Sequence, residues 1–93
     1  MSIIRINEFQ SAEGKSEELN EFLNSLLPYI SSSEGCISCE VLRQKDAKNC
    51  FVVIERWESV ESHMESIAKF PKEKMQSAIS LFAGAPKGNY YNA

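Results

Sequence analysis

The sequence lacks any long hydrophobic run and any N-terminal targeting pattern. No stretch approaches the roughly 18 apolar residues that a membrane-spanning helix needs. The first ten residues, MSIIRINEFQ, have none of the charged start, long apolar stretch or small-residue cleavage site of a signal peptide. We therefore expect a cytoplasmic protein with no membrane partner.

Positive charge is also scarce. Ten Lys and Arg stand against 13 Asp and Glu, which gives a formal net charge of -3 and an isoelectric point near 5.1. The basic residues are scattered along the chain, whereas binding to a phosphate backbone needs a clustered basic face. This composition argues against nucleic acid as the main partner.

Cysteine is rare, and no cofactor motif is present. The three cysteines are an odd number without a secretory signal, which favours reduced thiols. Cys36 and Cys39 fall in a predicted strand, where side chains three apart point to opposite faces, so we expect neither a redox pair nor a zinc site. The sequence has no Gly-rich phosphate loop, no Ser nucleophile setting and no metal-ligand cluster, so no metal or cofactor is expected.

Regular strand and helix patterns fill the first half of the chain. β-branched and aromatic side chains mark a strand over residues 3–9. Apolar residues at steps of three and four predict a helix over residues 19–30, whose last turn Pro28 should distort. Two further strand-like runs, 36–44 and 50–58, are joined by a short polar turn and predict a hairpin.

The second half predicts two helices and a last strand. Ser59 is placed to cap a short helix, and Pro71 opens another that ends before Gly84. The aromatic tail, residues 89–92, predicts a closing strand. The order β-α-β-β-α-α-β is the ferredoxin-like pattern, an α+β fold with helices on one face of a four-stranded antiparallel sheet. No repeat or linker interrupts it, so we predict one domain over residues 1–93.

The predicted sheet is apolar on both faces. In the third strand, Phe51, Val53 and Trp57 point to one face, while Val52 and Ile54 point to the other. Helices can cover only one of these faces, so the other needs a partner sheet. A second copy of the chain is the simplest partner, and we predict a homodimer through the sheet face that forms an α+β barrel. The alternative partner is a different protein of the same fold.

One segment carries a family resemblance. The run VIERWES, residues 53–59, followed by His63, is similar to the strand-helix motif of the antibiotic biosynthesis monooxygenase domain family. Gly14-Lys15 before the first helix, Glu34-Gly35-Cys36 before the second strand and the element order agree with it. The resemblance implies a dimeric α+β barrel. It also implies kinship with cofactor-independent monooxygenases of aromatic polyketides and quinols, with haem-degrading enzymes, and with members of no established activity.

An oxygenase of this kind needs particular side chains. Oxygen reacts without a metal or flavin only if the substrate supplies the electron, as a deprotonated phenol or quinol does. The site then needs an apolar pocket, a proton acceptor and hydrogen bonds that hold the phenolate. We expect His63 to be the acceptor, because an unperturbed pKa of about 6.5 suits it, and Asn7 to donate the hydrogen bond. Structural roles remain open for both residues.

Four further residues are candidates for binding a small aromatic substrate. Trp57 would form a wall of the pocket or simply fill the core between sheet and helix. Glu55 shares its strand face and would have a raised pKa if unpaired, although Arg5 or Arg56 would neutralise it in an ion pair. The other two candidates are Phe22, on the apolar face of the first helix, and Tyr90, which either hydrogen-bonds a ligand or closes the sheet.

Three functions therefore compete. The first is a monooxygenase that oxidises a small quinol or phenol. The second is a non-catalytic dimeric module that binds a small apolar molecule or serves only a structural purpose. The third is haem binding or degradation, in which the resemblance assigns places to Asn7 and Trp57. His63, however, follows Trp57 by only six residues, about one helical turn too early for the iron ligand of that branch.

Overall fold

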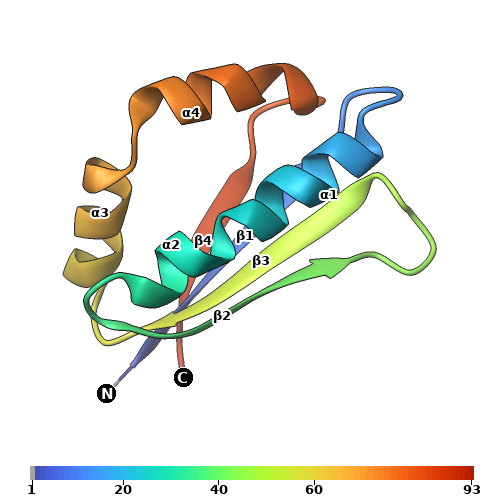
Figure 1. Cartoon of the computed structure of the whole chain (residues 1–93). Coiled ribbons are helices and arrows are strands. Elements are labelled where there is room, and N and C mark those ends of the chain that lie inside the picture. The colour runs from blue at the N-terminus through green and yellow to red at the C-terminus, as the bar shows by residue number, and fades with distance from the viewer. Residues whose placement is uncertain (1) are drawn as a thin grey trace.

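The computed structural model describes residues 2–93 and has the predicted ferredoxin-like α+β fold. Four antiparallel strands pair in the order β2-β3-β1-β4 and carry the helices on one face (Figure 1). The elements are β1 (Ile3–Gln10), α1 (Ser16–Ser25), α2 (Leu27–Ser32), β2 (Cys36–Arg43), β3 (Cys50–Trp57), α3 (Val60–Lys69), α4 (Lys72–Ala78), a 3₁₀ turn (Ile79–Leu81) and β4 (Lys87–Asn92). Within residues 2–93, no helix is both long and apolar enough to cross a membrane.

The first helical segment is two helices rather than one. The chain leaves α1 at Leu26 and starts α2 at Leu27, with Pro28 in the first turn of α2. A proline ring removes a backbone N–H and clashes with the preceding turn, but both effects are harmless in a first turn. The distortion predicted at Pro28 is therefore found as the start of a new helix.

The pairing register determines which side chains share a face. Arg5 of β1 lies opposite Glu55 of β3 and opposite Tyr90 of β4. Asn7 lies opposite Val53 in the next row on the same face. Because paired residues point the same way, the two rows bring the predicted site residues of three strands together under the helices.

The other sheet face has no helix over it (Figure 1). Its side chains alternate with those of the covered face. They include an apolar group formed by Ile4, Ile6, Leu42, Val52, Ile54 and Tyr91, with Glu8, Glu40 and Arg56 among the charged residues beside it. Leu42 and Tyr91 are nearly half exposed. The sequence prediction of two apolar faces is thus confirmed, and one of them is uncovered in the isolated chain.

A β-bulge corrects the prediction for the two cysteines of β2. The register shifts between Cys36 and Ser38, so that Cys36 pairs with Trp57 while Cys39 pairs with Glu55. Trp57 and Glu55 point to the same face, so Cys36 and Cys39 share that face instead of opposing each other. The one extra residue in the bulge is Ile37, which is exposed. All three cysteines are free and half-buried.

The hydrocarbon core lies at one end of the covered face. Leu19 and Leu23 of α1 are fully buried against Phe51 and Val53 of β3. These residues follow the helical step of four and the strand step of two that the sequence shows. At the opposite end of the same face, Trp57 is also fully buried, but a cavity remains beside it under α3 and α4.

Candidate functional site

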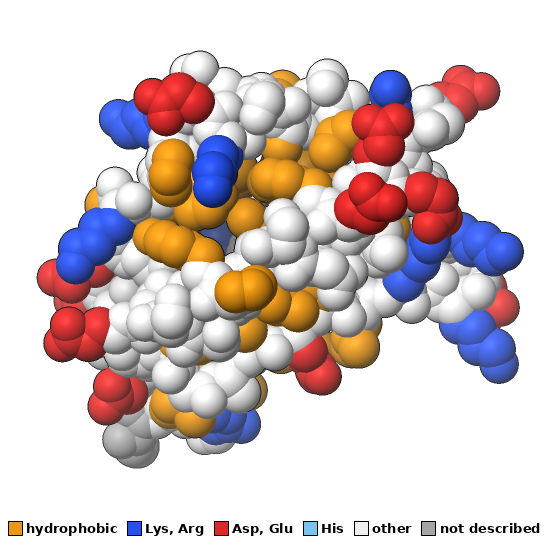
Figure 2. Space-filling model, in the orientation of Figure 1, with side chains coloured by type: hydrophobic (Ala, Val, Ile, Leu, Met, Phe, Trp, Pro, Cys, Tyr) orange, Lys and Arg blue, Asp and Glu red, His pale blue; other side chains and the backbone are white. Residues whose placement is uncertain are grey.

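A cavity of about 450 Å³ lies between the sheet and the helices. Arg5, Asn7, Val53, Glu55 and Trp57 line its floor, while its helical walls are largely apolar, with Leu26, Tyr29, Ile30, His63, Ser66, Ile67, Phe70 and Met75. Hydrophobic side chains surround a hollow on the helix-bearing face (Figure 2). The volume and the mixture of an apolar wall with a few polar groups are typical of a small-molecule site.

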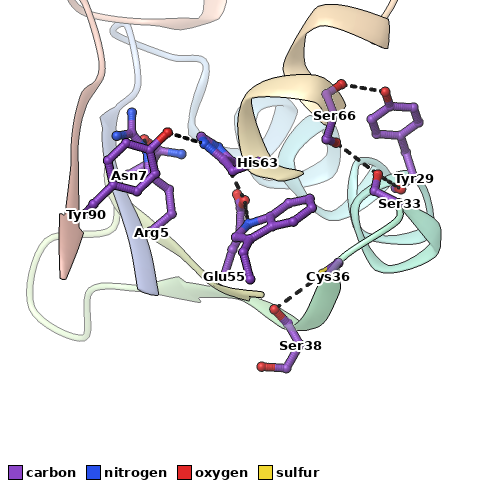
Figure 3. A network of polar contacts seen from close by, with 11 residues as sticks. Arg5, Asn7, Tyr29, Ser33, Cys36, Ser38, Glu55, His63, Ser66 and Tyr90 are labelled. Atoms are coloured by element: carbon purple, nitrogen blue, oxygen red, sulfur yellow. Dashed lines mark hydrogen bonds and ion pairs between the residues drawn. The ribbon is translucent and has the colours of Figure 1, made fainter. Parts of the chain in front are cut away.

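The arch formed by α3 and α4 leaves room for the cavity. In α4 only Ala78 is buried, so this helix lies over the sheet without packing closely on it. In contrast, α3 is anchored at one side by polar contacts. The Tyr29 hydroxyl donates to the Ser66 carbonyl oxygen over 2.6 Å, and the Ser33 and Ser66 hydroxyl oxygens lie 2.9 Å apart. These contacts hold α3 to α2 (Figure 3).

His63 points from α3 toward the sheet. The helix starts as predicted, because the Ser59 hydroxyl accepts a hydrogen bond from the Ser62 backbone N–H over 3.1 Å. His63 lies one turn later and is only 3 % exposed. Its Nδ1 is 2.6 Å from the Tyr90 hydroxyl oxygen, and its Nε2 is 3.7 Å from Glu55 Oε1 (Figure 3).

Glu55 is buried and hydrogen-bonded to its strand neighbour on the same face. The Trp57 indole N–H donates to Glu55 Oε1 over 2.8 Å. Burial raises the pKa of Glu55, and this outweighs the opposing effects of the Trp57 hydrogen bond and the Arg5 charge. The predicted ion pair with Arg5 or Arg56 is wrong, because neither arginine forms an ion pair with Glu55 within residues 2–93. Arg56 lies on the other face and donates to the Ser2 hydroxyl.

The electrostatics of the site keep His63 uncharged. Burial is the main cause, and the nearby Arg5 charge adds to it, so the pKa of His63 falls from 6.5 to about 4. An imidazole with this pKa is neutral at physiological pH and retains one lone pair that can accept a proton. The pKa assumed from sequence alone was therefore too high, because burial cannot be read from a single histidine in a helix.

Arg5 and Asn7 form a polar pair on β1. Arg5 Nε donates to Asn7 Oδ1 over 3.1 Å, and Arg5 Cζ lies 4.6 Å from the centre of the Tyr90 ring. Gly88 on β4 provides the space for this arrangement, since an added Cβ there would collide with both Arg5 and Asn7. The hydrogen bond uses the acceptor oxygen of the Asn7 amide, so its Nδ2 donor has no partner within residues 2–93.

The structure brings together most of the predicted site residues. Asn7, Glu55, Trp57 and His63 all line the cavity. Tyr90, on β4, does not line the cavity but contacts His63 and Arg5, which do. Phe22 lies apart, since it packs against the hydrocarbon core at the other end of the sheet face.

Sequence reasoning gave Arg5 no place in the site except as a counter-ion. Its alternation with Asn7 on β1 was the available signal, because residues two apart in a strand share a face. Ser66 and Tyr29 were missed altogether. No sequence signal marks them, since their contact joins segments 37 residues apart.

The site does not fit haem iron. Tyr90 occupies Nδ1 of His63, and Glu55 Oε1 lies 3.7 Å from Nε2, which leaves no room for a porphyrin plane on that nitrogen. The position of Glu55 thus agrees with the short Trp57–His63 spacing in disfavouring His63 as a haem ligand.

Comparisons with known proteins agree on the fold. Residues 2–68 match the family model described as antibiotic biosynthesis monooxygenase. A protein from Shewanella oneidensis is 25 % identical, with a TM-score of 0.82 over 97 % of this chain and 88 % of that one. A Nitrosomonas europaea protein named for the same family is 15 % identical, with a TM-score of 0.90 over 99 % of this chain and 89 % of that one.

A further similar structure comes from Streptomyces nogalater. It is a variant of SnoaB, a cofactor-independent oxygenase, and is 17 % identical, with a TM-score of 0.83 over 99 % of this chain and 92 % of that one. No curated protein sequence matches the chain. At these identities the solved structures establish the shared fold, while the family model supplies the kinship in sequence.

Proposed function

The chain belongs to the antibiotic biosynthesis monooxygenase family, and from this membership and the cavity we propose a cofactor-independent monooxygenase that oxidises a small aromatic quinol or phenol with O₂. The observation that carries the proposal is the meeting of Arg5, Asn7 and His63 at one end of an otherwise apolar cavity with a tryptophan wall. This arrangement supplies what the reaction requires, namely an apolar site for the ring, a proton acceptor and groups that stabilise negative charge.

The proposed reaction starts with loss of the phenolic proton. The phenolate gives one electron to O₂, which produces an aryloxyl radical and superoxide. The two combine at a ring carbon that carries hydrogen, commonly the carbon para to the oxygen, and form a hydroperoxide. Loss of water then leaves a second carbonyl group, so one oxygen atom enters the product and the other leaves as water.

Stabilisation of the phenolate is the main task of the protein in this proposal. The Asn7 Nδ2 donor has no partner among residues 2–93 and the Arg5 charge lies beside it, so both can act on an oxygen anion in the cavity. Electrostatic effects of this kind are stronger in an apolar site than in water. They favour the deprotonated substrate and thereby lower the barrier to electron transfer.

His63 is the proposed proton acceptor, with Tyr90 as its positioning residue. If Nδ1–H donates to the Tyr90 hydroxyl oxygen, Nε2 carries the free lone pair and can accept a proton beside Glu55. An imidazolium formed there would lie 3.7 Å from Glu55 Oε1, which could stabilise it. Because the resting pKa is about 4, His63 is a weak base, and deprotonation depends on Arg5 and Asn7 as well.

Oxygen uptake tests this function directly. The metal-free protein is mixed with a panel of hydroquinones and naphthols, and the rate is compared with autoxidation. We expect a rate above background that falls about tenfold or more in His63→Ala and in Asn7→Ala, a loss of about 1.4 kcal/mol in transition-state stabilisation. Glu61→Gln, on the exposed side of α3, is the control and should keep the wild-type rate. Absence of any rate above background, or equal rates in all four proteins, contradicts the proposal.

We further propose that the protein acts as a homodimer through the uncovered sheet face. That face presents Ile4, Ile6, Val52 and Ile54 in adjacent strands, whereas monomeric proteins rarely expose an apolar patch of this kind. The chain's own copy offers an identical apolar sheet, and closed symmetric pairs are the commonest assemblies. The cavity lies on the opposite face, so both sites would remain accessible.

Sedimentation velocity tests the dimer. Ile54→Lys places a charge in the centre of the uncovered face and should convert the protein to a monomer. Met64→Lys introduces the same charge at an exposed position of α3 and should leave the dimer intact. A wild-type protein that sediments as a monomer at micromolar concentration would overturn the assignment.

The cytoplasm remains the proposed location. Its support is chemical, because all three cysteines are free, as is usual for thiols in a reducing compartment. Fractionation of cells that express the full chain would test it, and recovery in a secreted fraction would contradict it.

A further inference from the structure

The cavity contains a cation without a counter-ion. Arg5 forms no ion pair in the part of the chain that the structure describes. Its Nε donates to Asn7 and its plane lies against the Tyr90 ring, but no hydrogen bond of residues 2–93 uses Nη1 or Nη2. One terminal nitrogen, Nη2, lies beside Gly88 of β4, and both remain without a hydrogen-bond partner within residues 2–93 on a residue that lines the cavity.

Glu55, the acidic residue paired with Arg5 in the strand register, does not form an ion pair with it. Glu55 lies directly opposite Arg5 in the strand pairing, yet its Oε1 accepts the Trp57 indole N–H. Glu55 is the only acidic residue that lines the cavity, whereas Arg5 and Lys72 are both cationic. Even with Glu55 ionised, one acidic side chain stands against two cationic ones in the lining drawn from residues 2–93, so the cavity carries an excess of positive charge in a protein of net charge -3.

This charge pattern has a chemical meaning. A guanidinium group presents parallel N–H donors that match a carboxylate in a bidentate pair, and such a pair is strong where water is excluded. Burying a cation without a partner costs free energy, because the group loses its contact with water. A bound ligand of opposite charge would offset this desolvation penalty. Lys72 is exposed to solvent, so the guanidinium of Arg5 is the only partly buried cation in the lining drawn from residues 2–93, and it suits one negative charge better than the two of a phosphate monoester.

We propose that the cavity selects aromatic acids, with the ligand's carboxylate bound by Nη1 and Nη2 of Arg5 and its ring against Trp57. This inference rests on the proposed function, since it uses the same cavity, and it narrows the substrate class to phenols or quinols that carry a carboxylate. Arg5 is then a specificity-determining residue that binds the carboxylate, and stabilisation of the phenolic oxygen, which the proposed function shares between Arg5 and Asn7, falls to Asn7 for such substrates.

A matched pair of inert probes tests the inference. 2-Naphthoate and 2-naphthamide have the same ring and nearly the same shape but differ in charge, and neither is a substrate for oxidation by the proposed route. Isothermal titration calorimetry should show that the wild-type protein binds the naphthoate about tenfold or more tightly, about 1.4 kcal/mol. Equal affinity for the two probes, or binding of neither, overturns the proposal without any variant.

Variants test whether Arg5 causes the preference for 2-naphthoate over 2-naphthamide. In Arg5→Gln the ratio of the two affinities should fall to about one, because the amide keeps hydrogen-bonding groups but loses the charge. Lys69→Gln removes the same charge from an exposed position of α3 and should keep the wild-type ratio. A naphthoate preference that persists in Arg5→Gln would contradict the assignment.

Failure of this inference is distinguishable from failure of the proposed function. If the protein oxidises neutral quinols but does not prefer the naphthoate, the proposed preference for aromatic acids is refuted and the proposed oxygenase activity is not. A naphthoate preference that depends on Arg5, without oxygen uptake on any hydroxylated aromatic acid, would leave the binding site standing and refute the oxygenase.

Discussion

The two ends of the helix-covered sheet face differ although the same strands form both. At one end, Phe51 and Val53 meet Leu19 and Leu23 of α1, and the contact is dry and filled. At the other end, the row of Arg5 and Glu55 lies under α3 and α4, which span it without filling it. The difference teaches that the covering helices, rather than the sheet, decide where this fold stabilises itself and where it leaves a site.

The largest expected difference between the two ends is in stability. Leu23→Ala removes a fully buried side chain and should lower the free energy of unfolding by about 2–5 kcal/mol. Ile67→Ala, at the mouth of the cavity, should cost less than about 1 kcal/mol, because this side chain is 58 % exposed. Urea denaturation at one fixed protein concentration measures both. Equal losses would mean that the cavity end is packed like the core.

The next effect concerns pH. His63 has a pKa of 6.5 when unfolded and about 4 when folded, so the unfolded chain binds more protons in that interval and stability falls as the pH is lowered through it. Between pH 7 and pH 5 the wild-type protein should lose about 2 kcal/mol more than His63→Gln, at about 1.4 kcal/mol for each pH unit below 6.5.

Charged and titratable side chains that face His63 also influence the pH dependence of stability. They are Glu55 from β3, Arg5 from β1 and Tyr90 from β4. Glu55 has the opposite sign, because its raised pKa makes the fold lose stability as the pH rises above 4.5. Comparison with His63→Gln separates the contribution of His63 to the pH dependence from that of Glu55, since Glu55 is present in both proteins. Identical pH profiles would show that His63 is not held neutral by the fold.

The smallest effect on stability should come from Gly88→Ala. The added Cβ would meet the mobile ends of Arg5 and Asn7, which can swing away, so the cost should stay below about 1 kcal/mol. The naphthoate affinity should nevertheless fall about tenfold, because both side chains leave their places. Gly84→Ala is the matched control, since a Cβ there meets nothing within 4 Å. Calorimetry that shows no difference between the two variants would contradict the assigned role of the Arg5–Asn7 pair.

Sequence periodicity was sufficient to predict which side chains lie on the covered face of the sheet. The strand step of two placed Glu55 with Trp57, and the helical step placed Leu19 with Leu23, because each element has one regular repeat. The same logic failed at the bulge near Cys36, since one extra residue leaves no mark in the pattern of residue types.

Positions that depend on pairing between distant segments were beyond sequence reasoning. A helical pattern shows that Phe22 faces inward but not which end of the sheet it reaches, and it reaches the core end. Likewise, the contact of Tyr90 with Arg5 and His63 depends on the register of β4 with β1. The expected counter-ion for Glu55 was wrong because Trp57 already supplies a donor.

The most direct test of the account is a turnover experiment under ¹⁸O₂ with the substrate that gives the fastest oxygen uptake. Mass spectrometry of the product is compared with the peroxide released. A monooxygenase at the Arg5–Glu55 end of the sheet should place one ¹⁸O atom in each product molecule, with the second oxygen in water, and Asn7→Ala should slow this incorporation. Formation of hydrogen peroxide with no ¹⁸O in the product, or an unchanged rate in Asn7→Ala, would contradict the account.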